Sequence, residues 1–132
     1  MPLVLAIPAL PVQNIIRSVA YYSERLGFIA RHQDTGFAIL VRDAVELHVW
    51  EASDESWNGR AGAAPVVSGA ESFIAGTASC RIQVVGVNEL HAELQPRGVL
   101  HGNAPLTEQP WGTREFGVVD ADGNLITFFE RV

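Results

Sequence analysis

The two halves of the chain repeat the same order of local patterns. Residues 12–28 read VQNIIRSVAYYSERLGF, and residues 84–99 read VVGVNELHAELQPRGV. Each run passes from an apolar strand end through a helix-capping residue into an amphipathic helix, and closes on Arg, Gly and an apolar residue. A unit of this size cannot bury its helix face alone, so two units are expected to pair. The duplication predicts two βαβββ modules.

Alternating apolar residues place the strands of each module. Asn14 is expected to cap a helix from Ile15 to Leu26, and Asn88 to cap a shorter one. Pro8 indicates that the first strand lies at an edge or pairs unusually, because proline cannot donate to a ladder. The expected strands are residues 3–12, 28–33, 37–42, 45–51, 79–85, 114–119 and 125–130.

We predict one domain over residues 1–132. It divides into a first module at 1–51, a loop insertion at 52–77 that is rich in Gly, Ala and Ser, and a second module at 78–132. The hydrophobic share of 48% suffices for one core.

Charge and cysteine content narrow the class of protein. The formal net charge of −6 argues against a nucleic-acid surface. The single cysteine, Cys80, excludes an intrachain disulfide and fits a cytoplasmic location. No apolar run is long enough to span a bilayer, so no membrane partner is expected.

Aromatic residues mark a candidate binding surface. Trp111 lies between Pro110 and Gly112 at the start of a hairpin, where it either stacks on a flat ligand or packs under the hairpin. The same two alternatives, ligand contact or core, stand for Phe37. Trp50 and Trp57 are further candidates for the border of a binding groove, and a structural role is the alternative for Trp50.

Polar residues accompany these aromatic residues. Glu46 and His48 are two positions apart in a strand, so both point to one face. They either line a cleft or are ordinary polar strand residues. Carboxylates at Glu46, Glu51, Asp54 and Glu55 would favour a cationic ligand tail, or form a solvated charge run.

Several motifs identify a resemblance. They are the first strand with Pro8, YYSERLGF (21–28), DTGFAILVRD (34–43), EQPWGTREF (108–116) and DADGN (120–124). With them the chain resembles the vicinal-oxygen-chelate superfamily of glyoxalases, extradiol dioxygenases and bleomycin-resistance proteins, and most closely its bleomycin-resistance branch. The 52–77 insertion and an extra Thr113 depart from that pattern.

The resemblance implies an α+β fold in which paired βαβββ modules form a curved mixed sheet with a cleft. It implies a homodimer in which Pro8 lets the N-terminal strand cross to the partner subunit. Phe37 and Trp111 would stack on the bithiazole tail of a bleomycin-type antibiotic. The expected function is sequestration of the drug in its metal-loaded form, without catalytic turnover.

The superfamily's enzymes hold a divalent metal at four positions that fall here on Ile7, Glu46, Ser79 and Thr127. Only Glu46 is a good ligand, so we expect no metal site and no cofactor. The alternative is a metal-dependent enzyme of the superfamily, such as a glyoxalase-like lyase, thiol transferase or dioxygenase. A third hypothesis is a binder of another planar compound.

Overall fold

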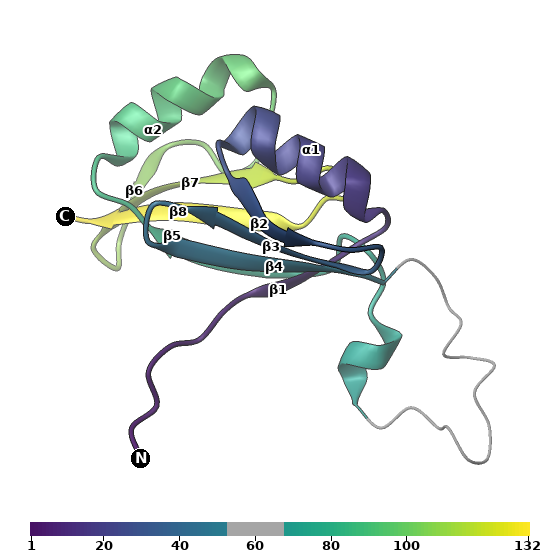
Figure 1. Ribbon diagram of the computed structural model, residues 1–132. Helices are drawn as coiled ribbons and strands as arrows, with labels where there is room; N and C mark the ends of the chain where they lie inside the picture. The colour runs from purple at the N-terminus through teal and green to yellow at the C-terminus, as the bar shows by residue number, and fades with distance from the viewer. Residues whose placement is uncertain (53–67) are drawn as a thin grey trace.

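The computed structural model describes residues 1–52 and 68–132, which form two four-stranded sheets side by side under two helices (Figure 1). The first half contains β1 (Ala9–Val12), α1 (Ile15–Leu26), β2 (Ile29–Gln33), β3 (Phe37–Arg42) and β4 (Val45–Glu51). The second half contains the short helix η2 (Gly69–Ser72), β5 (Ser79–Gln83), α2 (Val87–Leu94), η3 (Gln95–Arg97), β6 (Thr107–Gln109), β7 (Thr113–Val119) and β8 (Leu125–Arg131).

Both sheets have the same topology. Their strand orders are β1-β4-β3-β2 and β5-β8-β7-β6. The first strand of each module runs parallel to the last, and the other pairs are antiparallel. The prediction of two paired βαβββ modules is therefore confirmed. The module boundaries at residues 51 and 78 remain a prediction.

Local sequence explains the first helix. The Asn14 side chain accepts a hydrogen bond from Arg17 N at 2.9 Å, and Gly27 ends the helix at a φ of +75°. The predicted face is buried through Ile15, Tyr22 and Leu26, and Ser18 is also buried. This helix packs on β2, β3 and β4.

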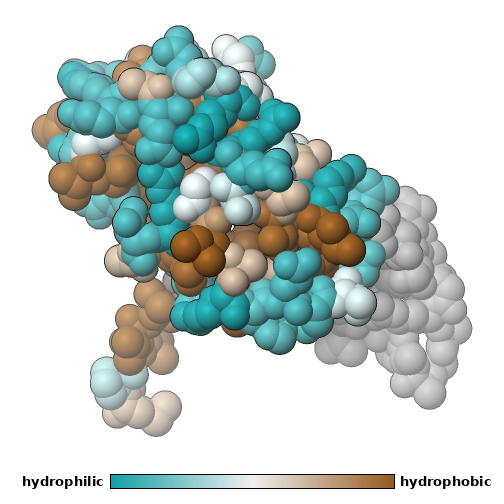
Figure 2. Space-filling view, turned by 45° about the horizontal axis from the view of Figure 1, so that its top comes forward, coloured by the Kyte–Doolittle hydropathy of each residue, from teal (hydrophilic) through white to brown (hydrophobic). Residues whose placement is uncertain are grey.

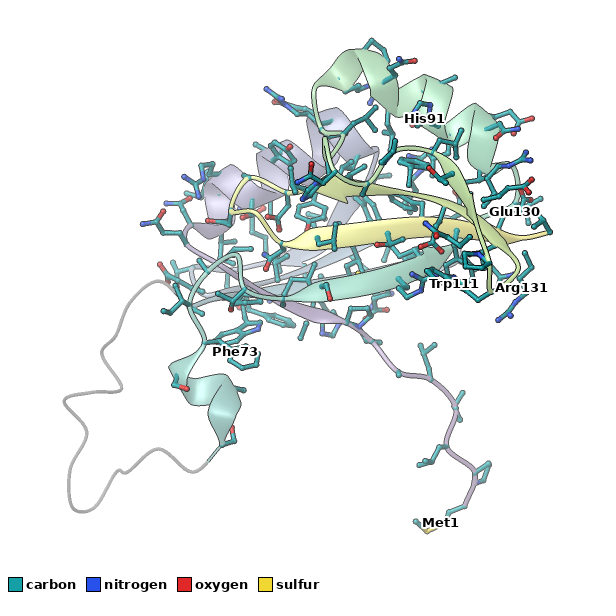
Figure 3. The ribbon with its side chains drawn as sticks, turned by 180° about the vertical axis from the view of Figure 1, so that it is seen from behind. Met1, Phe73, His91, Trp111, Glu130 and Arg131 are labelled. Carbon is teal, nitrogen blue, oxygen red and sulfur yellow. The ribbon has the colours of Figure 1, made fainter. Side chains whose placement is uncertain are left out.

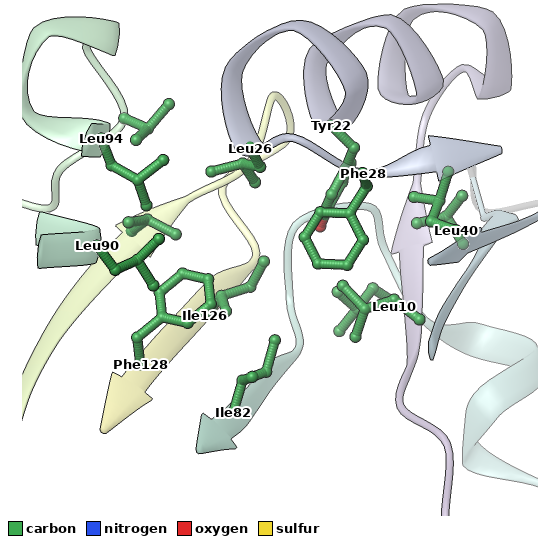
Figure 4. Close-up of a cluster of buried hydrophobic side chains, with 14 of the residues drawn as sticks. Leu10, Tyr22, Leu26, Phe28, Leu40, Ile82, Leu90, Leu94, Ile126 and Phe128 are labelled. Atoms are coloured by element: carbon green, nitrogen blue, oxygen red, sulfur yellow. The ribbon is translucent and has the colours of Figure 1, made fainter. Parts of the chain in front are cut away.

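One hydrophobic cluster joins the modules. Tyr22, Leu26 and Phe28 of the first module lie beside Leu90 and Ile126 of the second (Figure 4). Because the cluster draws on both sheets and both helices, each module completes the core of the other.

Polar contacts fix the two modules at the turn before β8. The Tyr22 hydroxyl donates to Asp120 at 2.9 Å, and the buried Asn124 side chain donates to the Pro11 carbonyl oxygen at 2.8 Å. Arg17 pairs with Asp122 at 2.6 Å. The predicted 120–124 turn therefore also binds the first module.

The first strand is shorter than predicted. It begins at Ala9 and not at residue 3, and Leu3, Val4 and Leu5 are 97%, 89% and 76% exposed. Residues 1–7, which we call the N-terminal arm, leave the body as an apolar chain (Figure 2). Pro8 lacks the N–H that would continue the ladder, although its carbonyl still accepts from His48 N at 2.9 Å.

Three other predictions about elements are corrected. The N-cap of α2 is Gly86 and not Asn88, and Glu130 of β8 accepts from the Gly86 and Val87 amides at 2.9 and 3.1 Å. The strand β6 was missed because it has three residues. The strands predicted at 28–33 and 79–85 are shorter by one and two residues.

The described end of the 52–77 insertion is tied to the body. Gly76 N donates to the Pro11 carbonyl at 3.1 Å, and a Cβ at Gly76 would lie 2.1 Å from the Asp122 carbonyl oxygen. This backbone contact requires glycine. Within residues 1–52 and 68–132, no helix is long and apolar enough to cross a membrane.

Candidate functional site

The open face of the first sheet brings four predicted site residues together. Along β3 and β4 the buried residues alternate with half-buried ones, because Ala38, Leu40, Leu47 and Val49 point to the helices. The half-buried residues on the opposite face include Phe37, Glu46, His48 and Trp50.

Contacts within this face are direct. The Phe37 ring meets the His48 ring edge-on at 5.0 Å between centroids, and Phe37 is the register partner of Trp50. His48 Nε2 lies 2.6 Å from Glu46 Oε2. Phe37 is therefore a half-buried ring of the open face and not part of the buried core.

Glu46 is held by two partners. The hydrogen bond with His48, followed by the Arg31 guanidinium at 2.9 Å, lowers the pKa of Glu46 below its usual value. The carboxylate is thus ionised near neutral pH, and its charge is already matched by Arg31. Of the four carboxylates expected to form an acidic region, Glu46 and Glu51 are described, and Asp54 and Glu55 lie outside the described residues.

Sequence reasoning missed one aromatic contact of this face. Phe73, which follows η2, lies over Trp50 with ring centroids 6.2 Å apart and an interplanar angle of 32°. Phe73 is 41% exposed. The pair extends the aromatic surface of Phe37 toward the insertion. Trp57, also predicted as a ligand contact, lies outside the described residues.

The open face of the second sheet carries an ion pair that was not predicted. Arg81 donates to Glu115 at 2.6 and 3.3 Å, and Thr113 Oγ1 donates to the same carboxylate at 2.7 Å. The Arg81 hydrogen bond is the largest cause that lowers the pKa of Glu115. The Arg81 guanidinium also lies 4.9 Å from the Phe129 ring centroid, a cation–π contact.

Trp111 lies on the turn between β6 and β7 and is 64% exposed. A hydrogen bond from Gly112 N to the Gln109 carbonyl closes the turn, and Gly112 adopts a φ of +91°. Packing under the hairpin, the alternative for Trp111, is therefore wrong. Figure 3 shows Trp111 and Phe73 at opposite ends of the molecule.

Two pockets accompany these faces. The larger, about 310 Å³, lies where the β3–β4 turn faces the end of β5, and its walls are mostly apolar. Asp43 in this turn adopts a φ of +51°. The smaller, about 150 Å³, lies on the open face of the second sheet and is lined mostly by polar residues.

The side chains at the four superfamily metal positions do not fit a metal. Ile7 has no donor atom and Glu46 is held by Arg31 and His48. Among residues 1–52 and 68–132, no three His, Cys, Asp or Glu side chains gather into a group that could hold an ion. Burial raises the pKa of Cys80 to about 11, so this thiol is a weak nucleophile near neutral pH.

Curated relatives decide the family. The chain is 51% identical over 127 residues to a bleomycin resistance protein of Geobacillus stearothermophilus, with 96% of each chain covered. The same values hold for a bleomycin resistance protein of Staphylococcus aureus. The chain belongs to the bleomycin resistance protein family.

Solved structures support the fold of this family member. The bleomycin-binding protein of Streptomyces verticillus in complex with copper(II)-bleomycin matches with a TM-score of 0.73 at 24% identity, covering 97% of this chain and 96% of that one. A bleomycin resistance determinant encoded on the transposon Tn5 matches with a TM-score of 0.71 at 23% identity, covering 98% of each. No family model matches the sequence.

Proposed function

We propose that this protein binds a bleomycin-type antibiotic and protects by lowering the concentration of free drug. The observation that carries the proposal is the exposed Trp111 ring on a hydrogen-bonded turn, in a chain half identical to bleomycin resistance proteins. Each flat ring stacked on an aromatic side chain contributes about 0.5–1.5 kcal/mol beyond the area it buries. Affinity, and not turnover, is then the mechanism.

The drug groove needs two copies of the chain. Phe37 pairs in register with Trp50, and the Trp50 and Phe73 rings are in tilted contact. Since Trp111 lies at the opposite end from Phe73, one chain cannot clamp a single ring between Phe37 and its own Trp111 (Figure 3). A two-fold dimer brings Phe37 of one protomer toward Trp111 of the other and forms two such clamps.

The N-terminal arm supports this dimer. Its apolar residues lie exposed, and exposed apolar segments of this kind mark interaction surfaces. The body offers a matching place, because β1 pairs only with residues 48–51 of β4. Residues 45–47 of β4 keep a strand edge that β1 does not cover, so the arm of the partner subunit is proposed to add there as a strand.

The larger pocket adjoins that edge. Val45 of β4 and Val84 and Val85 after β5 line it, so the side chains of an added arm would enter an apolar space. Deletion of residues 1–7 is expected to convert the dimer to monomer at micromolar concentration in analytical ultracentrifugation. The substitution Ile16→Ala, at an exposed apolar residue of α1, is the control. A truncated chain that remains dimeric would contradict the arm exchange.

The metal of a loaded drug would be held by the drug's own ligands, because the four superfamily positions of this chain do not supply a donor set. We therefore infer a protein without catalytic turnover or a resident cofactor. We place its action in the cytoplasm, where the drug must be intercepted before it reaches its target.

Fluorescence titration tests the function. Metal-bound bleomycin is expected to quench tryptophan emission of the wild-type protein at micromolar drug. Trp111→Ala and Phe37→Ala each should weaken binding by at least about two- to tenfold, which is the stacking contribution alone, and the lost buried area adds to it. Ile16→Ala is expected to bind as the wild type does. Wild-type protein without quenching or measurable heat of binding would refute the proposal.

A further inference from the structure

The smaller pocket has the form of a second binding site. It lies on the open face of the second sheet, between β7, β8 and the segment that leads into β6. Its volume of about 150 Å³ gives room for roughly five water-sized groups. The lining residues are Asn103, Ala104, Pro105, Thr107, Gln109, Glu115, Phe116, Gly117 and Thr127.

Gly117 shapes this pocket. The segment before β6 is held against it, because Gly117 N donates to the Ala104 carbonyl and His101 N donates to the Gly117 carbonyl, both at 2.9 Å. A Cβ at Gly117 would lie 2.7 Å from Ala104 Cβ. The pocket therefore depends on a glycine in β7, and its walls are fixed by backbone hydrogen bonds.

The pocket contains polar groups without partners. Within the described part of the chain, the side chains of Thr127, Gln109 and Asn103 make no hydrogen bond. Thr127 and Gln109 are half-buried. Half-buried amide and hydroxyl groups that line a fixed pocket without partners are ready to bind a polar guest.

Charge selects the class of guest. Glu115 at the pocket is 8% exposed and its charge is compensated by Arg81. Arg81 does not line the pocket but already compensates the charge of Glu115, so an added cation would gain little, and an added anion would meet the Glu115 carboxylate. A neutral group that both donates and accepts hydrogen bonds is not repelled by the carboxylate and needs no charged partner.

We propose that this pocket binds a primary carboxamide of the ligand, with Thr127 and Gln109 as its hydrogen-bond partners, because Glu115 already accepts from Arg81 and Thr113. The proposal rests on the proposed function, to which it adds a subsite for a neutral polar group. Gln109 begins the turn that carries Trp111, so one ligand can reach the ring and the pocket together.

An amide probe tests the pocket without the drug. In a titration of ¹⁵N-labelled protein with acetamide, saturable shifts are expected at the amides of Gly117 and Thr127. Thr127→Val and Gln109→Met, which keep the size of each side chain, should abolish these shifts. Gln95→Met, at an exposed residue after α2, is the matched control and should not change them.

Two results would overturn the carboxamide site. One is an absence of saturable shifts at Gly117 and Thr127 in the wild type. The other is ethylammonium producing the same shifts at lower concentration than acetamide, which would show a preference for a cation.

The drug separates this inference from the proposed function. With metal-bound bleomycin, Thr127→Val should weaken binding about two- to tenfold, as the loss of one hydrogen bond implies. If the wild type binds the drug and both pocket variants bind equally well, the subsite is wrong and the function stands. If acetamide binds at the pocket and the drug does not bind at all, the function is wrong and the pocket stands.

Discussion

At the scale of single residues, the contact between Tyr22 and Asp120 is a buried polar link between the two modules. Tyr22 has an exposed fraction of 0% and Asp120 of 4%, so the hydrogen bond at 2.9 Å is fully shielded from water. Tyr22→Phe removes one of the donors to this buried carboxylate while keeping the ring. We expect a loss of about 1–3 kcal/mol in the free energy of unfolding, measured by urea denaturation.

Tyr21→Phe is the matched control for this change. Its hydroxyl donates to the Val119 carbonyl at 2.9 Å, but the group is only partly buried and its acceptor is neutral. The loss should therefore be smaller, within about 1 kcal/mol. Equal losses for the two variants would argue against a special role of the Asp120 contact.

At the scale of elements, α2 shows a stabilising contact that depends on residues far apart in the sequence. Glu130 accepts hydrogen bonds from Gly86 and Val87 at the first turn of the helix, and these bonds lower its pKa. A lowered folded-state pKa gives stability above the usual value near 4.5, and this stability is lost as pH falls through the folded-state pKa. Glu130→Ala should therefore lower Tm at pH 7, and the difference from wild type should shrink at pH 3.

Glu130→Gln keeps one acceptor oxygen without a charge, so its Tm should lie between those of the wild type and Glu130→Ala at pH 7. Thermal unfolding followed by circular dichroism at several pH values measures all three proteins. A Tm difference between wild type and Glu130→Ala that stays constant from pH 7 to pH 3 would contradict capping by the carboxylate.

The same helix explains where prediction from sequence ends. Asn14 was recognised as a cap because its acceptor and the amide it binds are three residues apart. Glu130 was not, since it reaches the start of α2 from 43 and 44 residues away. The strands β3 and β4 were predicted with correct bounds, because alternation of polar and apolar residues is a local signal. The three residues of β6 are too few for alternation to be visible.

At the scale of the whole molecule, a group of neighbouring site residues was predictable on the first sheet, whereas only Trp111 was predicted on the second. Phe37, Glu46, His48 and Trp50 share one face by strand periodicity, which sequence alone can give. Phe73 reaches Trp50 from a segment with no periodic pattern. Phe37 and Trp111 lie on different sheets, so the distance between them depends on how the two sheets are placed. No local sequence pattern predicts that placement.

This separation allows a test of a groove shared between subunits. Protein carrying Phe37→Ala and protein carrying Trp111→Ala each form homodimers in which both clamps lack one ring. When the two are unfolded together and refolded, half of the dimers should be mixed, and each mixed dimer regains one intact clamp and holds one clamp without rings. About one quarter of all clamps should then bind metal-bound bleomycin with wild-type affinity.

Isothermal titration fitted to two classes of site, one at wild-type affinity and one at the weakened affinity of the homodimers, measures this fraction. A clamp formed within one chain predicts no recovery, since every chain in the mixture carries one substitution. Mixing the two folded homodimers without unfolding is the control, and it should recover binding only as fast as the subunits exchange. Recovery to about one quarter would therefore require that Phe37 and Trp111 of each site come from different protomers.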